Sequence, residues 1–137
     1  MNNYLFGVDL STDIATHKDE INKVYRWYQD GRWHRLDGPA YINEEDKRYA
    51  WYRDGKLHRL DGPAGINEKN KIYRWFINDK HHRLDGPAYI ADINKIYEWW
   101  INGKDKTNEI TKWLTDNEID WRNMSMEEKV LLKVVFR

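Results

Sequence analysis

The sequence predicts a mostly β (α+β) fold, namely an elongated antiparallel sheet of tandem β-hairpins followed by a small α-helical cap. Two residues recur every 24 positions: the tryptophans Trp27, Trp51, Trp75 and Trp99, and the tyrosines Tyr25, Tyr49, Tyr73 and Tyr97. The string His-Arg-Leu-Asp-Gly-Pro-Ala occurs unchanged at 34–40, 58–64 and 82–88. After residue 107 the apolar residues adopt helical spacing instead. A fixed period of this length is the sequence signature of a repeat protein.

Size and composition fit one globular unit with three segments. We expect an N-terminal cap segment at 1–22, repeats at 23–106 (three full units and a partial fourth) and a helical cap at 107–137. Charged residues make up 34% of the chain and mean hydropathy is −0.99, but 15% of the residues are aromatic. Each ring buries about 150–250 Å², so aromatic residues can stabilise a polar chain.

Each unit reads as two strands and three turns. Residues 24–28 are rich in β-branched and aromatic residues, which is typical of a strand, and Gln29-Asp30-Gly31-Arg32 is a tight turn. Leu36-Asp37-Gly38-Pro39 forms a second turn before a return strand at 40–42, which the proline starts because it lacks an N–H. Residues 43–46 then lead into the next unit.

The two ends differ from the repeats. Tyr4–Val8 resembles a strand, and 13–22 is polar, as in a short helix or loop. Residues 108–116 have one apolar helical face with Asn108 as N-cap, and Ser125–Glu128 has the spacing of a capping box. A second helix then follows with the apolar residues Val130, Leu131, Val134 and Val135. We expect these helices to cover the open edge of the sheet; the alternative is an element that binds a partner.

Strand alternation places Tyr25 and Trp27 on one face, as a ladder of core aromatic residues. The alternative is a stacking platform for carbohydrate or bases. The opposite face mixes rings with charges, including Arg26, Arg74 and Trp100. It is either a solvated face with cation–π pairs or a partner surface rich in the usual anchor residues.

The repeated polar residues His34, His58 and His82 with Asp37, Asp61 and Asp85 are the best candidates for chemistry. Equivalent residues of neighbouring units lie about 9–10 Å apart, too far to share one zinc ion. No cysteine is present, and the two serines lie outside the repeats. We therefore expect no catalytic residues, metal site or cofactor. The structural repeat positions are then Trp27, Trp51, Trp75, Asp37, Asp61 and Asp85, with Asp accepting turn N–H groups and Arg and His pairing with Asp or with carbonyls.

The pattern Tyr-x-Trp-Tyr-x-Asp-Gly-x-x-His-x-x-Asp-Gly-Pro-Ala resembles the MORN repeat, in particular its second variety, over about residues 23–106. That family implies hairpins joined into a twisted sheet. The His-Arg-x-Asp-Gly-Pro-Ala form is similar to proteins of bacteriophages and large viruses, sometimes described as antitoxin-like. The resemblance therefore implies a factor that inhibits a host or defence protein. Arg35 and Pro39 stand near positions where the family often has glycine.

Function is expected in the residues that vary between units. The candidate partner contacts are Trp33, Tyr41, Arg53, His81 and Tyr89, together with Arg26, Arg74 and Trp100. Lys and Arg total 23, as do Asp and Glu, which argues against broad binding to nucleic acid or anionic membranes. The absence of cysteine and of a signal-peptide pattern fits a cytoplasmic location, the host cytoplasm for a phage protein. The alternatives to protein binding are a small-ligand, nucleotide or nucleic-acid binder that uses aromatic stacking, and a lipid-associated structural role.

Overall fold

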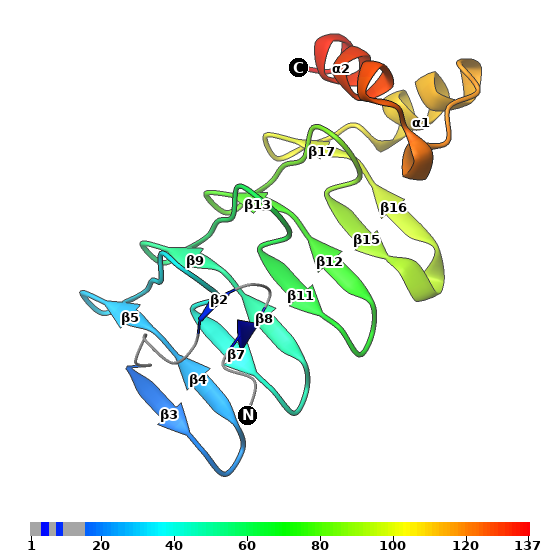
Figure 1. Cartoon of the computed structure of the whole chain (residues 1–137). Helices are drawn as coiled ribbons and strands as arrows, with labels where there is room; N and C mark the ends of the chain where they lie inside the picture. Colours follow the sequence, from blue (N-terminus) through cyan, green and yellow to red (C-terminus); the bar gives the residue numbers. More distant parts are fainter. Residues whose placement is uncertain (1–3, 6–7, 10–15) are drawn as a thin grey trace.

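The computed structural model describes residues 4–5, 8–9 and 16–137. Its main feature is an open eight-stranded antiparallel sheet whose strands lie side by side in chain order (Figure 1). These strands are β3 (His17–Asp19), β4 (Val24–Arg26), β7 (Tyr41–Asn43), β8 (Arg48–Ala50), β11 (Gly65–Asn67), β12 (Ile72–Arg74), β15 (Tyr89–Ala91) and β16 (Ile96–Glu98). The predicted fold class, a sheet of tandem hairpins followed by helices, is confirmed.

A second row of small hairpins lies beside the main sheet, one for each unit. They are β5–β6 (Tyr28–Gln29, Arg32–Trp33), β9–β10 (Tyr52–Arg53, Lys56–Leu57), β13–β14 (Phe76–Ile77, Lys80–His81) and β17–β18 (Trp100–Ile101, Lys104–Asp105). The strand predicted at 24–28 is therefore interrupted at Trp27. The Trp27 N–H bonds to the Ala40 carbonyl at 2.8 Å, and the Trp27 carbonyl accepts from the His34 N–H at 3.1 Å, so this backbone joins the two rows.

The tight turns of the small hairpins follow the sequence prediction. Asp30 and Gly31 have φ of 51° and 74°, as a two-residue hairpin turn that matches strand twist requires. The third unit has Asn78 and Asp79 at these positions, and both also have positive φ. At the other end of each unit the chain turns through a lysine with φ near 51–53°, at Lys23, Lys47, Lys71 and Lys95.

The N-terminal segment contributes the first edge of the sheet. β3 pairs with β4 in the register His17 to Arg26, so the helix or loop predicted for 13–22 is wrong over 17–19. Ladder hydrogen bonds to β4 outweigh the polar composition there, because β3 holds the position that a return strand holds in later units. β1 (Tyr4–Leu5) pairs with β2 (Val8–Asp9), whereas 6–7 of the predicted strand and 13–15 lie outside the described residues.

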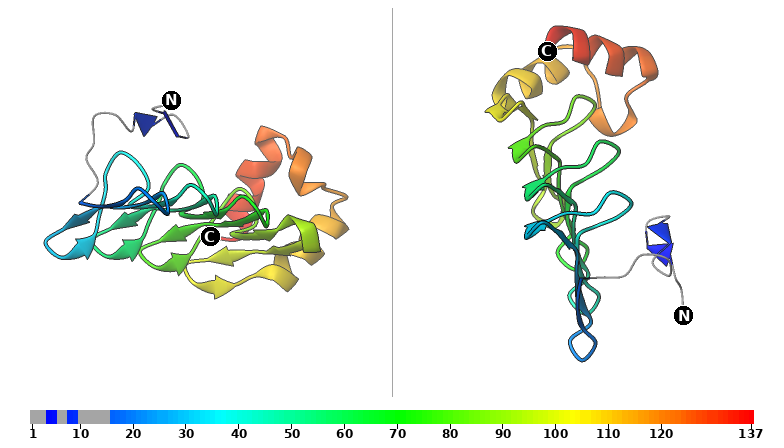
Figure 2. Two further views of the ribbon diagram at one scale, coloured as in Figure 1. Left: turned by 90° about the horizontal axis from the view of Figure 1, so that it is seen from below. Right: turned by 90° about the vertical axis from the view of Figure 1, so that its left-hand side faces the viewer.

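The His-Arg-Leu-Asp-Gly-Pro-Ala loops all project from the same face of the sheet, called here the loop face (Figure 2). The main core consists of Trp27, Ala40, Ile42, Tyr49, Trp51, Ala64 and Ile66, and the partly buried rings of Tyr25, Trp33, Tyr52, Tyr73 and Phe76 pack against it. Each return strand begins one residue later than predicted, because Ala40, Ala64 and Ala88 are fully buried at the loop ends and bond to the tryptophan N–H groups. The opposite side of the sheet is called the open face.

The chain ends in two helices, α1 (Thr107–Asp116) and α2 (Met126–Val135), with the short turns η1 (Asp92–Asn94) before β16 and η2 (Trp121–Asn123) between the helices. The N-cap prediction of Asn108 is wrong: α1 begins at Thr107, whose hydroxyl accepts the Trp99 N–H instead. The Ser125–Glu128 capping box is confirmed, with both hydrogen bonds present.

The helices form a second core on the last unit, made of Trp99, Ile101, Ile110, Leu114, Met124 and Leu132. α2 packs through Leu132, while the predicted apolar positions Val130, Leu131, Val134 and Val135 are exposed. Among the described residues, no helix has the length and apolar composition that a membrane crossing demands.

Candidate functional site

The repeated arginines of the loop face hold each loop together. The Arg59 guanidinium lies 3.9 Å above the centre of the Trp51 ring, donates from Nε to Asp61 at 2.9 Å, and donates from Nη1 to the Pro63 carbonyl at 3.2 Å. Arg35 and Arg83 repeat the same three contacts in their own units. The principal partner of each aspartate is therefore arginine, and the Arg59 hydrogen bond lowers the pKa of Asp61.

The repeated histidines join each unit to the next. Nδ1 of His34, His58 and His82 accepts the backbone N–H of Asp54, Asn78 and Asn102, the first turn residue of the following small hairpin, at 3.0–3.3 Å. Pairing with an aspartate of the same loop or with a carbonyl was expected. The histidine accepts the turn N–H instead, because the left-handed conformation of the turn residue directs this donor toward the preceding loop.

These contacts place the three histidine–arginine–aspartate segments in a row along the sheet, one per unit. Each histidine contacts the turn of the following unit, and each arginine covers the tryptophan of its own unit. The segments do not converge on one pocket. Their geometry explains why the string is repeated unchanged, since every unit needs the same links to its neighbours.

The open face carries a row of residues that pair directly across all eight strands. Strand register gives the order His17, Arg26, Tyr41, Ala50, Gly65, Arg74, Tyr89 and Glu98. In the first unit Arg26 lies 6.0 Å from the centre of the Tyr41 ring, and in the third Arg74 lies 5.7 Å from that of Tyr89. The middle unit has neither a ring nor an arginine in this row, because Ala50 and Gly65 stand opposite each other.

A second row of rings runs beside the first, along the small hairpins. At one end Trp33 contacts Tyr28, Tyr41 and Tyr52 at centroid distances of 4.6, 5.9 and 5.5 Å. At the other end His81 contacts Phe76, Tyr89 and Trp100 at 4.0, 6.5 and 5.6 Å. The open face thus has two aromatic groups, one centred on Trp33 and one on His81.

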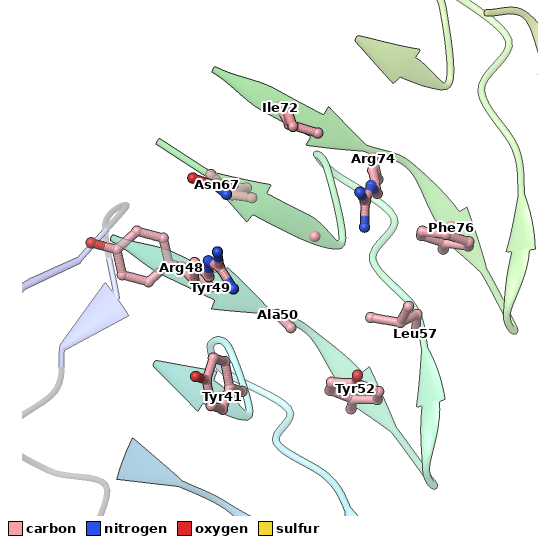
Figure 3. Close-up of a pocket in the computed structure, with 12 residues that line it drawn as sticks. Tyr41, Arg48, Tyr49, Ala50, Tyr52, Leu57, Asn67, Ile72, Arg74 and Phe76 are labelled. Carbon is pink, nitrogen blue, oxygen red and sulfur yellow. The ribbon is translucent and has the colours of Figure 1, made fainter. Parts of the chain in front are cut away.

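A hollow of about 400 Å³ lies between the two groups, with Ala50 and Gly65 at its floor (Figure 3). Tyr41 and Arg74 stand at its ends, Tyr52, Leu57 and Phe76 along one side, and Arg48 and Asn67 along the other. Burial raises the pKa of Tyr52, and the nearby Asp79 carboxylate raises it further, so this ring stays neutral.

Two arginines flank the hollow, and the Asp79 carboxylate lies next to its other side, where it accepts the backbone N–H of Leu57 at 2.7 Å. The lining of the hollow contains Arg48 and Arg74 and no carboxylate, and both arginine side chains are exposed. Among the described residues neither of them forms an ion pair. Although the whole chain is formally neutral, this region of the open face is cationic.

His81 acts here as a neutral ring. Burial lowers its pKa, and the positive charge of Arg74 lowers it further. Its Nδ1 is buried and has no hydrogen-bond partner in the part of the chain that the structure describes. At the position that Trp33 and Leu57 occupy in the other units, His81 therefore packs as an aromatic residue between Phe76 and Trp100.

The structure gathers most of the predicted contact residues on one face. Trp33, Tyr41 and Arg26 lie in the first aromatic group, and Arg74, His81, Tyr89 and Trp100 lie in or beside the second. Arg53 is separate: it lies on the loop face, in a groove lined by Trp51 and the loop residues 35–38 and 58–61. Tyr52, Leu57, Phe76, Arg48 and the hollow itself were missed. The signal for the hollow was present, because Ala50 and Gly65 depart from the large residues of the units on either side.

Comparison with family models, with curated proteins and with solved structures finds no match for this chain.

Proposed function

We propose that this chain is a non-enzymatic protein-binding module and that its partner binds on the open face. The observation that carries the proposal is the hollow at Ala50 and Gly65 between two half-buried aromatic groups, with two exposed arginines in its lining that form no ion pair among the described residues. Tyr, Trp and Arg are the residue types that dominate binding energy at protein interfaces. The loop face is engaged in holding the units together, so the open face is free to vary with the partner.

The resemblance to the viral form of the MORN-like repeat supports a partner in an infected host. In this proposal the module inhibits a host or defence protein by covering one of its surfaces. The sheet itself does no chemistry, because its repeated polar groups are engaged in contacts between loops and turns.

Aromatic stacking on a nucleotide or nucleic-acid base is the alternative function. The ring arrangement favours it less, since Trp33 stacks on Tyr52 with an interplanar angle of 29° and His81 lies against Phe76 at 4.0 Å. Ring faces that pack on each other are not available for inserted bases. Rings held this way form a firm, mostly flat surface, as a protein partner requires.

The test begins with the isolation of the partner from cells of the native host, followed by affinity measurement with both purified proteins. Tyr89→Ala and Trp100→Ala should weaken binding at least tenfold, whereas Arg53→Ala, on the loop face, should leave the affinity unchanged. Thermal unfolding of each variant separates lost contacts from lost folding. Weakening by Arg53→Ala alone would move the interface to the loop face.

A further inference from the structure

Comparison of the three units shows what the middle one lacks. In the first and third units the paired row holds a tyrosine next to an arginine, Arg26 with Tyr41 and Arg74 with Tyr89. In the second unit the same two positions are Ala50 and Gly65, which pair directly with each other. Two small residues opposite each other in one unit therefore leave out both the ring and the guanidinium that the other units have at this place.

The gap has the dimensions of a side-chain site. Three strand spacings separate the backbones of Tyr41 and Arg74, which is about 14 Å. Tyr52, Leu57 and Phe76 close one long side with apolar surface. The result is a recess of about 400 Å³, open to solvent above, with a small-residue floor and a largely apolar wall.

The molecule itself indicates which group fits this recess. Wherever the row is complete, the place next to an arginine is filled by a phenol ring, with the guanidinium 5.7–6.0 Å from the ring centre. An aromatic side chain from outside, seated over Gly65, would meet Arg74 on its paired strand in the same way. Aromatic rings also gain from edge and tilted contacts with the neighbouring rings.

Charge defines the surroundings of that ring. Arg48 and Arg74 are exposed and lack ion-pair partners among the described residues, and the nearest carboxylate to the lining that a hydrogen bond identifies, that of Asp79, is held by the Leu57 N–H on the side away from Arg48. A carboxylate close to the inserted ring would find a positive partner, whereas an ammonium group would be repelled. The recess therefore selects among partner segments by the shape of the inserted side chain and by the sign of the charge next to it.

We infer, on the basis of the proposed protein-binding function, that the hollow receives one aromatic side chain of the partner and that acidic residues next to it in the partner's sequence pair with Arg48 and Arg74. The middle unit is then the specificity site of the array. The two aromatic groups on either side supply the flat contact area around it.

Gly65→Tyr is the decisive variant because it fills the hollow with the residue that the other units carry. A Cβ atom at Gly65 would lie 3.8 Å from the Arg74 Cβ atom, an ordinary contact, and Gly65 does not adopt positive φ. The variant should therefore fold. Arg53→Ala serves as the control, since Arg53 lies in the loop-face groove and does not line the hollow.

The experiment is an NMR titration of the full chain with three blocked tripeptides, Glu-Trp-Glu, Lys-Trp-Lys and Glu-Ala-Glu. We expect Glu-Trp-Glu to shift the Gly65 and Ala50 amide signals. The other two peptides should bind at least tenfold more weakly. Gly65→Tyr should reduce binding of Glu-Trp-Glu at least tenfold, and Arg53→Ala should leave it within twofold.

Three results would overturn the inference: no shift at Gly65 and Ala50 with any peptide, equal binding of the lysine peptide, or unchanged binding by Gly65→Tyr. Failure of the proposed protein-binding function gives a different result from failure of the inference about the hollow. If the isolated partner still binds Gly65→Tyr normally but loses affinity with Tyr89→Ala, the open face is the interface and only the role of the hollow is wrong. If neither variant affects the partner, both proposals fail.

Discussion

Replacement of Arg59 by lysine tests whether the repeated arginine holds its unit together. Arg59→Lys keeps the positive charge but removes the planar group that lies 3.9 Å above Trp51 while bonding to both Asp61 and the Pro63 carbonyl. A partly desolvated cation–π contact contributes about 1–2 kcal/mol, and a hydrogen bond from a charged group about 1.5–3 kcal/mol. Since lysine can restore one of the two hydrogen bonds, we expect a loss of about 2–3 kcal/mol in the free energy of unfolding.

Asp61→Asn is the matched control for this prediction. The Asp61 side chain is 85% exposed, so its ion pair with Arg59 is well solvated and contributes below about 1 kcal/mol. Urea unfolding followed by tryptophan fluorescence and by circular dichroism measures both variants. The arginine side chains are 2%, 15% and 21% exposed at Arg35, Arg59 and Arg83, so the cost of lysine should fall in that order. A larger effect for Asp61→Asn than for Arg59→Lys would refute the reasoning.

Three further predictions concern other parts of the chain. Burial lowers the pKa of His81 and His82 from the ordinary 6.5, so the unfolded chain takes up protons before the folded chain does, and stability should fall as the pH drops below about 6.5. His81→Phe should reduce this dependence on pH in urea unfolding midpoints measured from pH 8 to 5. An unchanged dependence would contradict a buried neutral His81. Ser125→Ala removes half of the capping box on α2 and should cost about 1 kcal/mol by thermal unfolding, with Ser125→Thr, which keeps the capping hydroxyl, as control; equal stability of the two would contradict it. Lys47 has φ of 51°, so Lys47→Gly should raise stability by up to about 1 kcal/mol, and destabilisation would show that the lysine side chain contributes more than the backbone strain costs.

The fold could be predicted because the repeat encodes it locally. Asp30-Gly31 specifies the tight turn, the aromatic and β-branched residues specify the strands, and the 24-residue period requires identical neighbours. The break at Trp27 could not be foreseen, because it depends on hydrogen bonds to Ala40 and His34 across the unit. The strand at His17–Asp19 was missed for a similar reason: its polar side chains give no strand signal, and pairing with β4 alone defines it.

The sequence predicted some of the residues of the candidate site but not the hollow between them. Alternation placed Arg26, Arg74 and Trp100 on one face, and variation between units drew attention to Trp33 and Tyr41. Arg53, also predicted as a contact, neighbours Tyr52 in the chain and points to the opposite face, so its role as a contact stays a prediction. The small residues Ala50 and Gly65 were visible in the sequence, but the hollow over them also needs walls from the neighbouring strands and small hairpins, which no local pattern contains.

Arginine footprinting of the complex most directly tests the claim that the partner binds the open face and that the loop face only holds the units together. The chain is modified with phenylglyoxal with and without its purified partner, and the extent of modification of each arginine is read by mass spectrometry. Arg48, Arg74 and Arg53 are all exposed in the chain, so each can react. Open-face binding predicts that the partner protects Arg48 and Arg74 and leaves Arg53 reactive. Protection of Arg53 with Arg48 and Arg74 still fully reactive would contradict it.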